Sequence, residues 1–144
     1  MPSLDDKMLR EIIMDHYEYP RNKEKVNDER YDSIHMDSES CTDDIMVYLL
    51  FEDGKIKDIK FDGIACTIAT SSTSIMTELL IGKTKEEAEE IIKNYFNMIY
   101  EKEYDEDMLE EAIAFKYTYR QANRINCATI GWKGIRELLN KKEG

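Results

Sequence analysis

Three cysteines and one aspartate are the residues of this chain that could do chemistry together: Cys41, Asp43, Cys66 and Cys127. Cys66 follows a glycine turn (63–65), where an apolar strand is expected to give way to a helix. The unpaired N–H groups and the dipole at a helix N-terminus stabilise a thiolate, which is the nucleophilic and metal-binding form of cysteine. The alternative is a small buried side chain, since cysteine is among the residue types found most often in cores.

The number and spacing of the cysteines do not indicate a disulfide framework. Three is an odd count, and no Cys-x-x-Cys pair occurs. Sequence spacing alone is therefore only a weak indication of a metal site. Three inert thiols stay open as an alternative at this point.

A β-hairpin is needed to bring Cys66 close to Asp43, and the sequence between them predicts one. Residues 43–51 carry apolar side chains on both faces, which is typical of a central strand. Asp53-Gly54 then has the composition of a two-residue hairpin turn, so we expect 55–61 to return antiparallel. A further strand over 31–39 would complete a three-stranded sheet.

Counting outward from the turn predicts the register of the hairpin. It pairs Glu52 with Lys55, Leu50 with Lys57 and, roughly, Ile45 with Asp62, unless a β-bulge intervenes. Cys66 then lies beside Cys41 and Asp43, whose side chains leave one face of a strand because they are two residues apart. Cys127, expected to open the last helix, could complete a tetrahedral set that Zn²⁺ accepts.

Helical patterns occupy most of the remaining chain. We expect helices over 4–17, 66–81, 85–99 and 127–141, with a short one over 108–115 and no clear assignment for 117–126. Pro20 ends the first, and a capping box from Thr84 to Glu87 opens the third. The order predicts an α+β fold, a small three-stranded antiparallel sheet packed against several helices, as a single domain over 1–144.

Composition narrows the functional classes. The chain has 144 residues, of which 42% are hydrophobic and 35% charged, with a net charge of −11. An acidic chain repels phosphate backbones, so we expect no nucleic-acid partner, and without a long apolar run we expect no membrane span. The N-terminus lacks the pattern of a secretory signal, so a cytoplasmic location with reduced thiols is expected.

Other polar residues invite a functional interpretation. Arg124 would lie one helical turn before Cys127 and could offset the negative charge of a zinc–thiolate site. His16 stands alone at a helix end, where a structural role is expected. The run Ser71-Ser72-Thr73-Ser74 has no base spaced to activate it, so we interpret it as close helix packing.

Four motifs resemble the IscU/NifU-like family of iron–sulfur cluster assembly proteins. They are Asp15-His16-Tyr17-Glu18-Tyr19-Pro20-Arg21-Asn22, Cys41-Thr42-Asp43, Gly63-Ile64-Ala65-Cys66 and Arg124-Ile125-Asn126-Cys127-Ala128, in the family's order. The long segment between Cys66 and Cys127, the absence of a histidine directly before Cys127, and the absence of a Leu-Pro-Pro-Val-Lys string resemble the SufU-type branch. The family usually has glycine where Thr42 stands and often proline where Glu39 stands, which puts the loop shape in question but removes no ligand.

The resemblance implies a zinc ion bound by Cys41, Asp43, Cys66 and Cys127. It implies a zinc-dependent sulfurtransferase in which Cys41 accepts persulfide sulfur from a SufS-type cysteine desulfurase. Arg124 is the second catalytic residue that we expect, because of its spacing to Cys127. Sulfur would pass to a SufBCD-type assembly complex or to apo acceptor proteins. The alternatives are a non-enzymatic scaffold or carrier that assembles a [2Fe–2S] cluster on the same ligands, and a purely structural zinc domain, since thiolates suit both zinc and iron–sulfur clusters.

Overall fold

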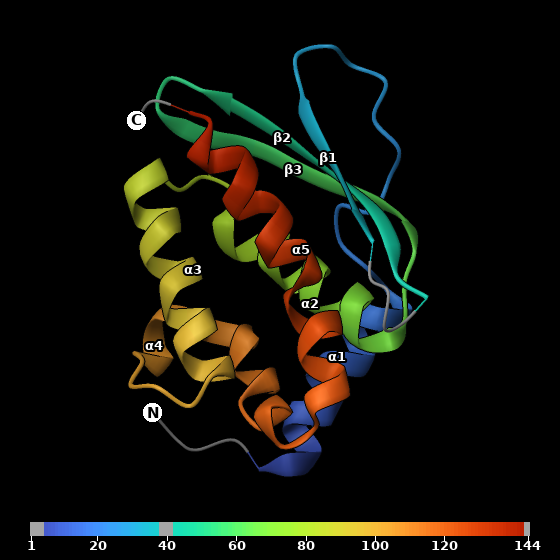
Figure 1. Cartoon of the computed structure of the whole chain (residues 1–144), viewed down its shortest axis with the longest axis vertical. Coiled ribbons are helices and arrows are strands. Elements are labelled where there is room, and N and C mark those ends of the chain that lie inside the picture. The colour runs from blue at the N-terminus through green and yellow to red at the C-terminus, as the bar shows by residue number, and fades with distance from the viewer. Residues whose placement is uncertain (1–4, 38–41, 143–144) are drawn as a thin grey trace.

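A computed structural model describes residues 5–37 and 42–142 of the chain. Its elements (Figure 1) are α1 (Asp6–Glu18), β1 (Asp32–Asp37), β2 (Asp44–Glu52), β3 (Lys55–Ile64), α2 (Thr67–Leu80), α3 (Lys85–Ile99), α4 (Glu106–Leu109), two 3₁₀ helices, η1 (Glu110–Phe115) and η2 (Thr118–Arg120), and α5 (Ala122–Asn140). The expected α+β fold with one three-stranded antiparallel sheet is confirmed. No described helix is both long enough and apolar enough to cross a bilayer.

The sheet has the order β1-β2-β3, so β2 is central, as its apolar faces predicted. Asp53 and Gly54 form the turn with φ of 55° and 73°, and Glu52 pairs with Lys55 as expected. From Leu50 on, the expected register is wrong by one residue, because a β-bulge lies at Leu50/Phe51. Leu50 therefore lies opposite Asp58, and Ile45 lies opposite Gly63.

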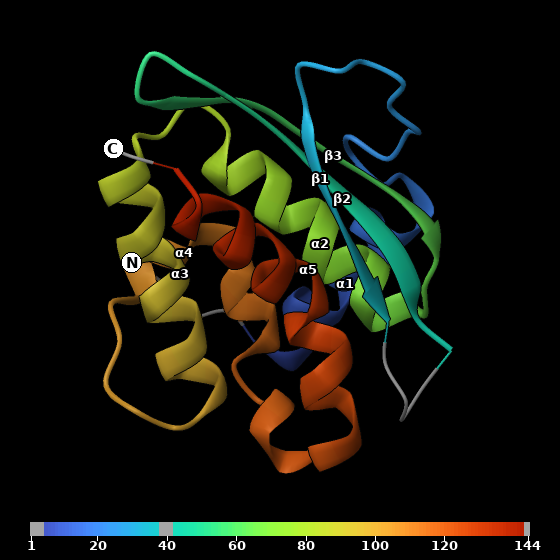
Figure 2. The same ribbon diagram turned by 45° about the horizontal axis from the view of Figure 1, so that its top comes forward.

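Helices α2 and α5 cover one face of the sheet, and α3 lies beyond them (Figures 1 and 2). Alternate residues of β2, Ile45, Val47 and Leu49, point into this core and are buried. The contact with α5 is close at Gly134, where an added Cβ would lie 3.0 Å from Met36 Cγ. A larger residue there would push the helix away from the sheet.

Buried hydroxyl groups run along α2. Ser71, Ser72, Thr73 and Ser74 are all buried, which fits the packing role expected for this run. Ser72 Oγ donates to the carbonyl of Ala128 (2.7 Å) and accepts from Trp132 Nε1 (3.1 Å). These bonds join α2 to α5 immediately after Cys127.

The start of α5 differs from the sequence expectation. Cys127 does not open the helix, because α5 begins at Ala122 and places Cys127 in its second turn. Gln121, at the N-cap position, makes no side-chain capping bond, so the sequence carried no start signal of the usual kind. Arg124 is helical and does lie one turn before Cys127.

Candidate metal centre

Asp43, Cys66 and Cys127 meet at one point in the structure. A carboxylate oxygen of Asp43 and the two Sγ atoms all lie within 4.8 Å of one another. They come from the segment just before β2, the N-cap of α2 and the second turn of α5. Cys41, the fourth expected ligand, lies outside the described residues.

The hairpin fixes Asp43 against Cys66. Asp44 pairs with Ile64 at the end of the ladder, so the next residues outward approach each other despite the register shift. The backbone N–H of Cys66 donates to Asp43 Oδ1 at 2.8 Å, and Cys66 Sγ lies 3.8 Å from Oδ2. One carboxylate therefore holds both the backbone and the sulfur of Cys66.

Gly63 permits this approach. Its φ is +126°, and a Cβ added there would lie 2.3 Å from the carbonyl oxygen of Asp44. Only glycine fits such close backbone contact at this φ. The glycine thus lets β3 stay paired with β2 up to Ile64, two residues before Cys66.

Cys66 is the N-cap of α2, as expected for a cysteine at a helix N-terminus. Its Sγ accepts the N–H of Ala69 at 3.4 Å, which satisfies one of the unpaired donors of the first turn. Cys66 therefore presents its sulfur to the N-terminal end of α2.

The donor set suits a thiophilic metal ion. Thiolate sulfur with carboxylate oxygen is a combination that Zn²⁺ accepts in tetrahedral sites. Asp43 is 1% exposed and Cys127 6% exposed, whereas Cys66 is half-buried. Access from solvent is therefore on the side of Cys66.

Arg124 is exposed on α5. No salt bridge of its guanidinium is found in the described part of the chain. Its place one turn before Cys127 agrees with the expectation, while a role in catalysis stays a prediction.

A second group of metal-ligating residue types surrounds His16, whose partners the sequence did not reveal. His16 is fully buried; its Nδ1 lies 2.8 Å from Ser74 Oγ, and its Nε2 lies 3.2 Å from Glu111 Oε1 and 3.8 Å from Glu78 Oε1. Arg21 donates its backbone N–H to the same Ser74 Oγ at 2.8 Å. Both ring nitrogens thus have protein partners, which supports the structural role expected for His16.

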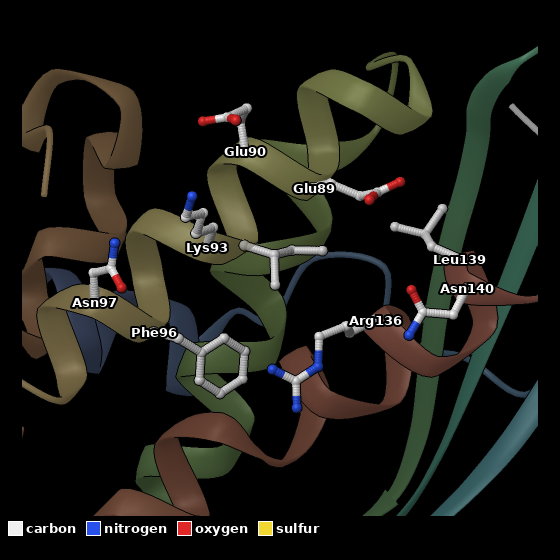
Figure 3. A pocket seen from close by; sticks show the side chains of 9 residues that line it. Glu89, Glu90, Lys93, Phe96, Asn97, Arg136, Leu139 and Asn140 are labelled. Atoms are coloured by element: carbon white, nitrogen blue, oxygen red, sulfur yellow. The ribbon is translucent and has the colours of Figure 1, made fainter.

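A cavity of about 390 Å³ between α3 and α5 is separate from the sulfur site. Figure 3 shows Arg136 reaching across it, with its guanidinium carbon 4.4 Å from the ring centroid of Phe96. None of its lining residues is Asp43, Cys66 or Cys127.

Comparisons with known proteins agree with the family that the sequence motifs indicated. The family model described as NifU-like N terminal domain matches residues 8–137. The zinc-dependent sulfurtransferase SufU of Bacillus subtilis (strain 168) is 35% identical over 140 residues, 96% of this chain and 94% of that protein. The iron–sulfur cluster assembly scaffold protein IscU of Thermotoga maritima is 35% identical over 102 residues, 71% of this chain and 72% of that protein.

A solved structure gives the same result. The crystal structure of a candidate iron–sulfur cluster assembly scaffold protein for the SUF system, from Fervidobacterium islandicum AW-1, has a TM-score of 0.78 at 37% identity. The match covers 90% of this chain and 94% of that one. The chain therefore belongs to the IscU/NifU-like family of iron–sulfur cluster assembly proteins, in the SufU-type branch that its motifs predicted.

Proposed function

We propose that this protein is a zinc-dependent sulfurtransferase of iron–sulfur cluster assembly, with Cys41 as the sulfur acceptor. The observation that carries the proposal is the convergence of Asp43, Cys66 and Cys127 within 4.8 Å. The similarity to SufU over 96% of the chain supports it. The reduced thiols that it requires agree with a cytoplasmic location.

The proposed reaction transfers a sulfur atom without net oxidation. The Cys41 thiolate attacks the outer sulfur of a persulfide on the donor protein, forming one S–S bond while the donor's S–S bond breaks. The donor cysteine leaves as a thiolate and takes up a proton, and Cys41 carries the persulfide. The donor we propose is a SufS-type cysteine desulfurase, and the next acceptor is a SufBCD-type complex or an apo protein.

Four residues would hold the zinc ion: Cys41, Asp43, Cys66 and Cys127. Zinc would supply a Lewis acid that keeps the cysteines deprotonated at neutral pH. The backbone N–H of Cys66 orients the Asp43 carboxylate, and the N–H of Ala69 orients Cys66 Sγ. Arg124, one turn before Cys127, would offset the excess negative charge of three thiolates and a carboxylate.

A second function has its own support. The Thermotoga maritima and Streptococcus pyogenes relatives are iron–sulfur cluster assembly scaffold proteins, at 35% and 30% identity. The same thiolates could hold a [2Fe–2S] cluster. In that case the cluster would be the product that the protein carries.

Mass spectrometry on Cys41 tests the proposal. The zinc-loaded protein is incubated with cysteine desulfurase and cysteine, and we expect one added sulfur atom on the Cys41 peptide together with faster desulfurase turnover. Cys41→Ser should abolish both. The matched control is Ser71→Ala, a hydroxyl bonded within its own helix, which should retain both.

Absence of a persulfide on Cys41 would contradict the sulfurtransferase. If iron and sulfide instead give the stable visible absorption of a cluster, without stimulation of the desulfurase, the scaffold function is supported.

A further inference from the structure

A groove of about 520 Å³ lies between α1 and the segment that leads into α5. It is lined by α1, the first residues of α2, the 3₁₀ helices and the start of α5. Figures 1 and 2 show the orange start of α5 beside the blue α1. The groove is distinct from the cavity between α3 and α5.

Positive charge is concentrated in this groove. Arg10, Arg120 and Arg124 line it, while Asp6 is the one acidic residue among the described residues that line it. The chain as a whole has a net charge of −11, so three arginines around one acid reverse the sign locally. Neither Arg10 nor Arg124 forms a salt bridge within residues 5–37 and 42–142.

Apolar side chains accompany the arginines. Leu9 and Phe115 are buried at the base, whereas Met14 is 44% and Tyr117 40% exposed. Arg120 lies over the Tyr117 ring, 4.4 Å from its centroid, which holds a cation and an aromatic face together. Exposed aromatic, methionine and arginine side chains are the composition enriched in protein–protein interfaces.

The groove is lined by residues that flank two members of the sulfur site in the chain. Thr67, directly after Cys66, lines one end, and Arg124, one turn before Cys127, lines the same groove. A partner segment bound in the groove would therefore lie near Cys66 and Cys127.

We propose that this groove docks the sulfur-donating protein through a segment that carries carboxylates beside a large apolar side chain. The inference rests on the proposed sulfur transfer for the identity of the partner and on the groove for its chemistry. Carboxylates would pair with Arg10, Arg120 and Arg124. The apolar side chain would contact Met14 and Tyr117. Opposite charges at the rim of an interface chiefly raise the association rate.

Charge reversal in the groove tests this docking. We expect Arg10→Glu and Arg120→Glu together to weaken the binding of cysteine desulfurase holoenzyme by roughly ten-fold, mainly through slower association. The difference from wild type should shrink at high salt. Persulfide formation on Cys41 should recover at saturating desulfurase, because neither arginine belongs to the metal site.

Lys93→Glu is the control for each single arginine reversal, because it changes the net charge by the same amount as Arg10→Glu or Arg120→Glu alone. It is an exposed helical cation four residues after Glu89, as Arg10 is four residues after Asp6, and it lies outside the groove. Equal binding by the groove variant and this control would overturn the proposal. So would a groove variant that changes only self-association in sedimentation, since the occupant would then be a second copy.

Different results would contradict the sulfurtransferase proposal and the docking proposal. Desulfurase binding that depends on Arg10 and Arg120 without any persulfide on Cys41 would support the groove and contradict the sulfurtransferase. If a persulfide forms on Cys41 but desulfurase binding does not depend on these arginines, the sulfurtransferase is supported and the groove is contradicted.

Discussion

Asp43 contributes two oxygens to two different contacts, one with the backbone and one with the sulfur of Cys66. Its meeting with Cys66 could be predicted from the alternation of β2 and the Asp53-Gly54 turn. The register of the hairpin could not be predicted, because nothing in the sequence marks the extra residue at the bulge. A one-residue shift left the ends of the hairpin together, so the predicted meeting survived the wrong register.

Replacement of Asp43 by alanine should weaken both metal binding and folding. It removes one proposed ligand, so zinc affinity should fall by at least about ten-fold. It also removes the acceptor of the Cys66 N–H, at a cost of about 1–3 kcal/mol. Zinc competition with a chromophoric chelator and urea unfolding measure the two effects.

Asp44→Ala is the control for Asp43→Ala. Asp44 is exposed and pairs with His35 on the surface, so we expect a loss of less than about 1 kcal/mol and unchanged zinc affinity. Equal zinc affinities for the two variants would remove Asp43 from the proposed ligand set.

His35 should titrate above its ordinary range. Its hydrogen bond with Asp44, 2.6 Å from Nε2 to Oδ1, raises the pKa of His35, and the nearby negative charge adds to this. Because the folded pKa is raised, the pair stabilises the fold fully below pH about 6.5 and loses that contribution as pH rises through the higher folded pKa. NMR titration of the ring protons should give a lower pKa in Asp44→Asn; an unchanged value would contradict the pairing.

At the scale of elements, the helices were the most predictable part of the chain and their junctions the least. The hydroxyl run at 71–74 predicted close packing of α2, and the capping box at Thr84 is present with Glu87. The start of α5 and the two 3₁₀ helices after α4 carry no capping side chain. Tertiary packing decides their geometry, as Phe115 shows by its burial.

Ser72→Ala should loosen the junction between α2 and α5. It leaves the buried Trp132 Nε1–H without its acceptor, so we expect about 1–3 kcal/mol of lost stability and altered fluorescence of the single tryptophan. Ser71→Ala is the control, because Ser71 Oγ donates to carbonyls of its own helix. Equal losses of stability in the two variants would show that the hydrogen bonds between α2 and α5 stabilise the fold no more than the bonds within α2.

Gly63→Ala should be far more damaging than Gly54→Ala. At Gly63 the new Cβ would collide with the Asp44 carbonyl at 2.3 Å, whereas at Gly54 nothing lies within 4 Å. Gly54→Ala should cost about 1–2 kcal/mol for its left-handed conformation. Gly63→Ala should exceed this and lower zinc affinity, measured by thermal unfolding and chelator competition; similar costs would contradict the close approach.

At the scale of the whole molecule, the order of helices and strands predicted the α+β fold, and the hairpin predicted the meeting of Asp43 with Cys66. They could not predict the arginine groove, because Arg10 and Arg120 lie in segments that only the packing of α1 against α2 and η1 brings together. Neither residue stands in a motif. A surface that is built from several helices gives no repeating pattern of residues in the sequence, so it cannot be predicted from periodicity.

Removal of the proposed zinc ion should lower stability without unfolding the chain. The core cluster extends through β2, β3, α2, α3 and α5, and among the described site residues only Cys66 and Cys127 touch it. Ligand linkage predicts that zinc at 100-fold its dissociation constant adds about 2.7 kcal/mol, or roughly 5–10 °C in Tm. A chelator should therefore lower Tm by that amount while far-UV circular dichroism stays unchanged at 25 °C. Loss of helical signal on chelation would mean that the core cannot hold the fold alone, and the metal would then be structural, as in a zinc domain that folds only when loaded.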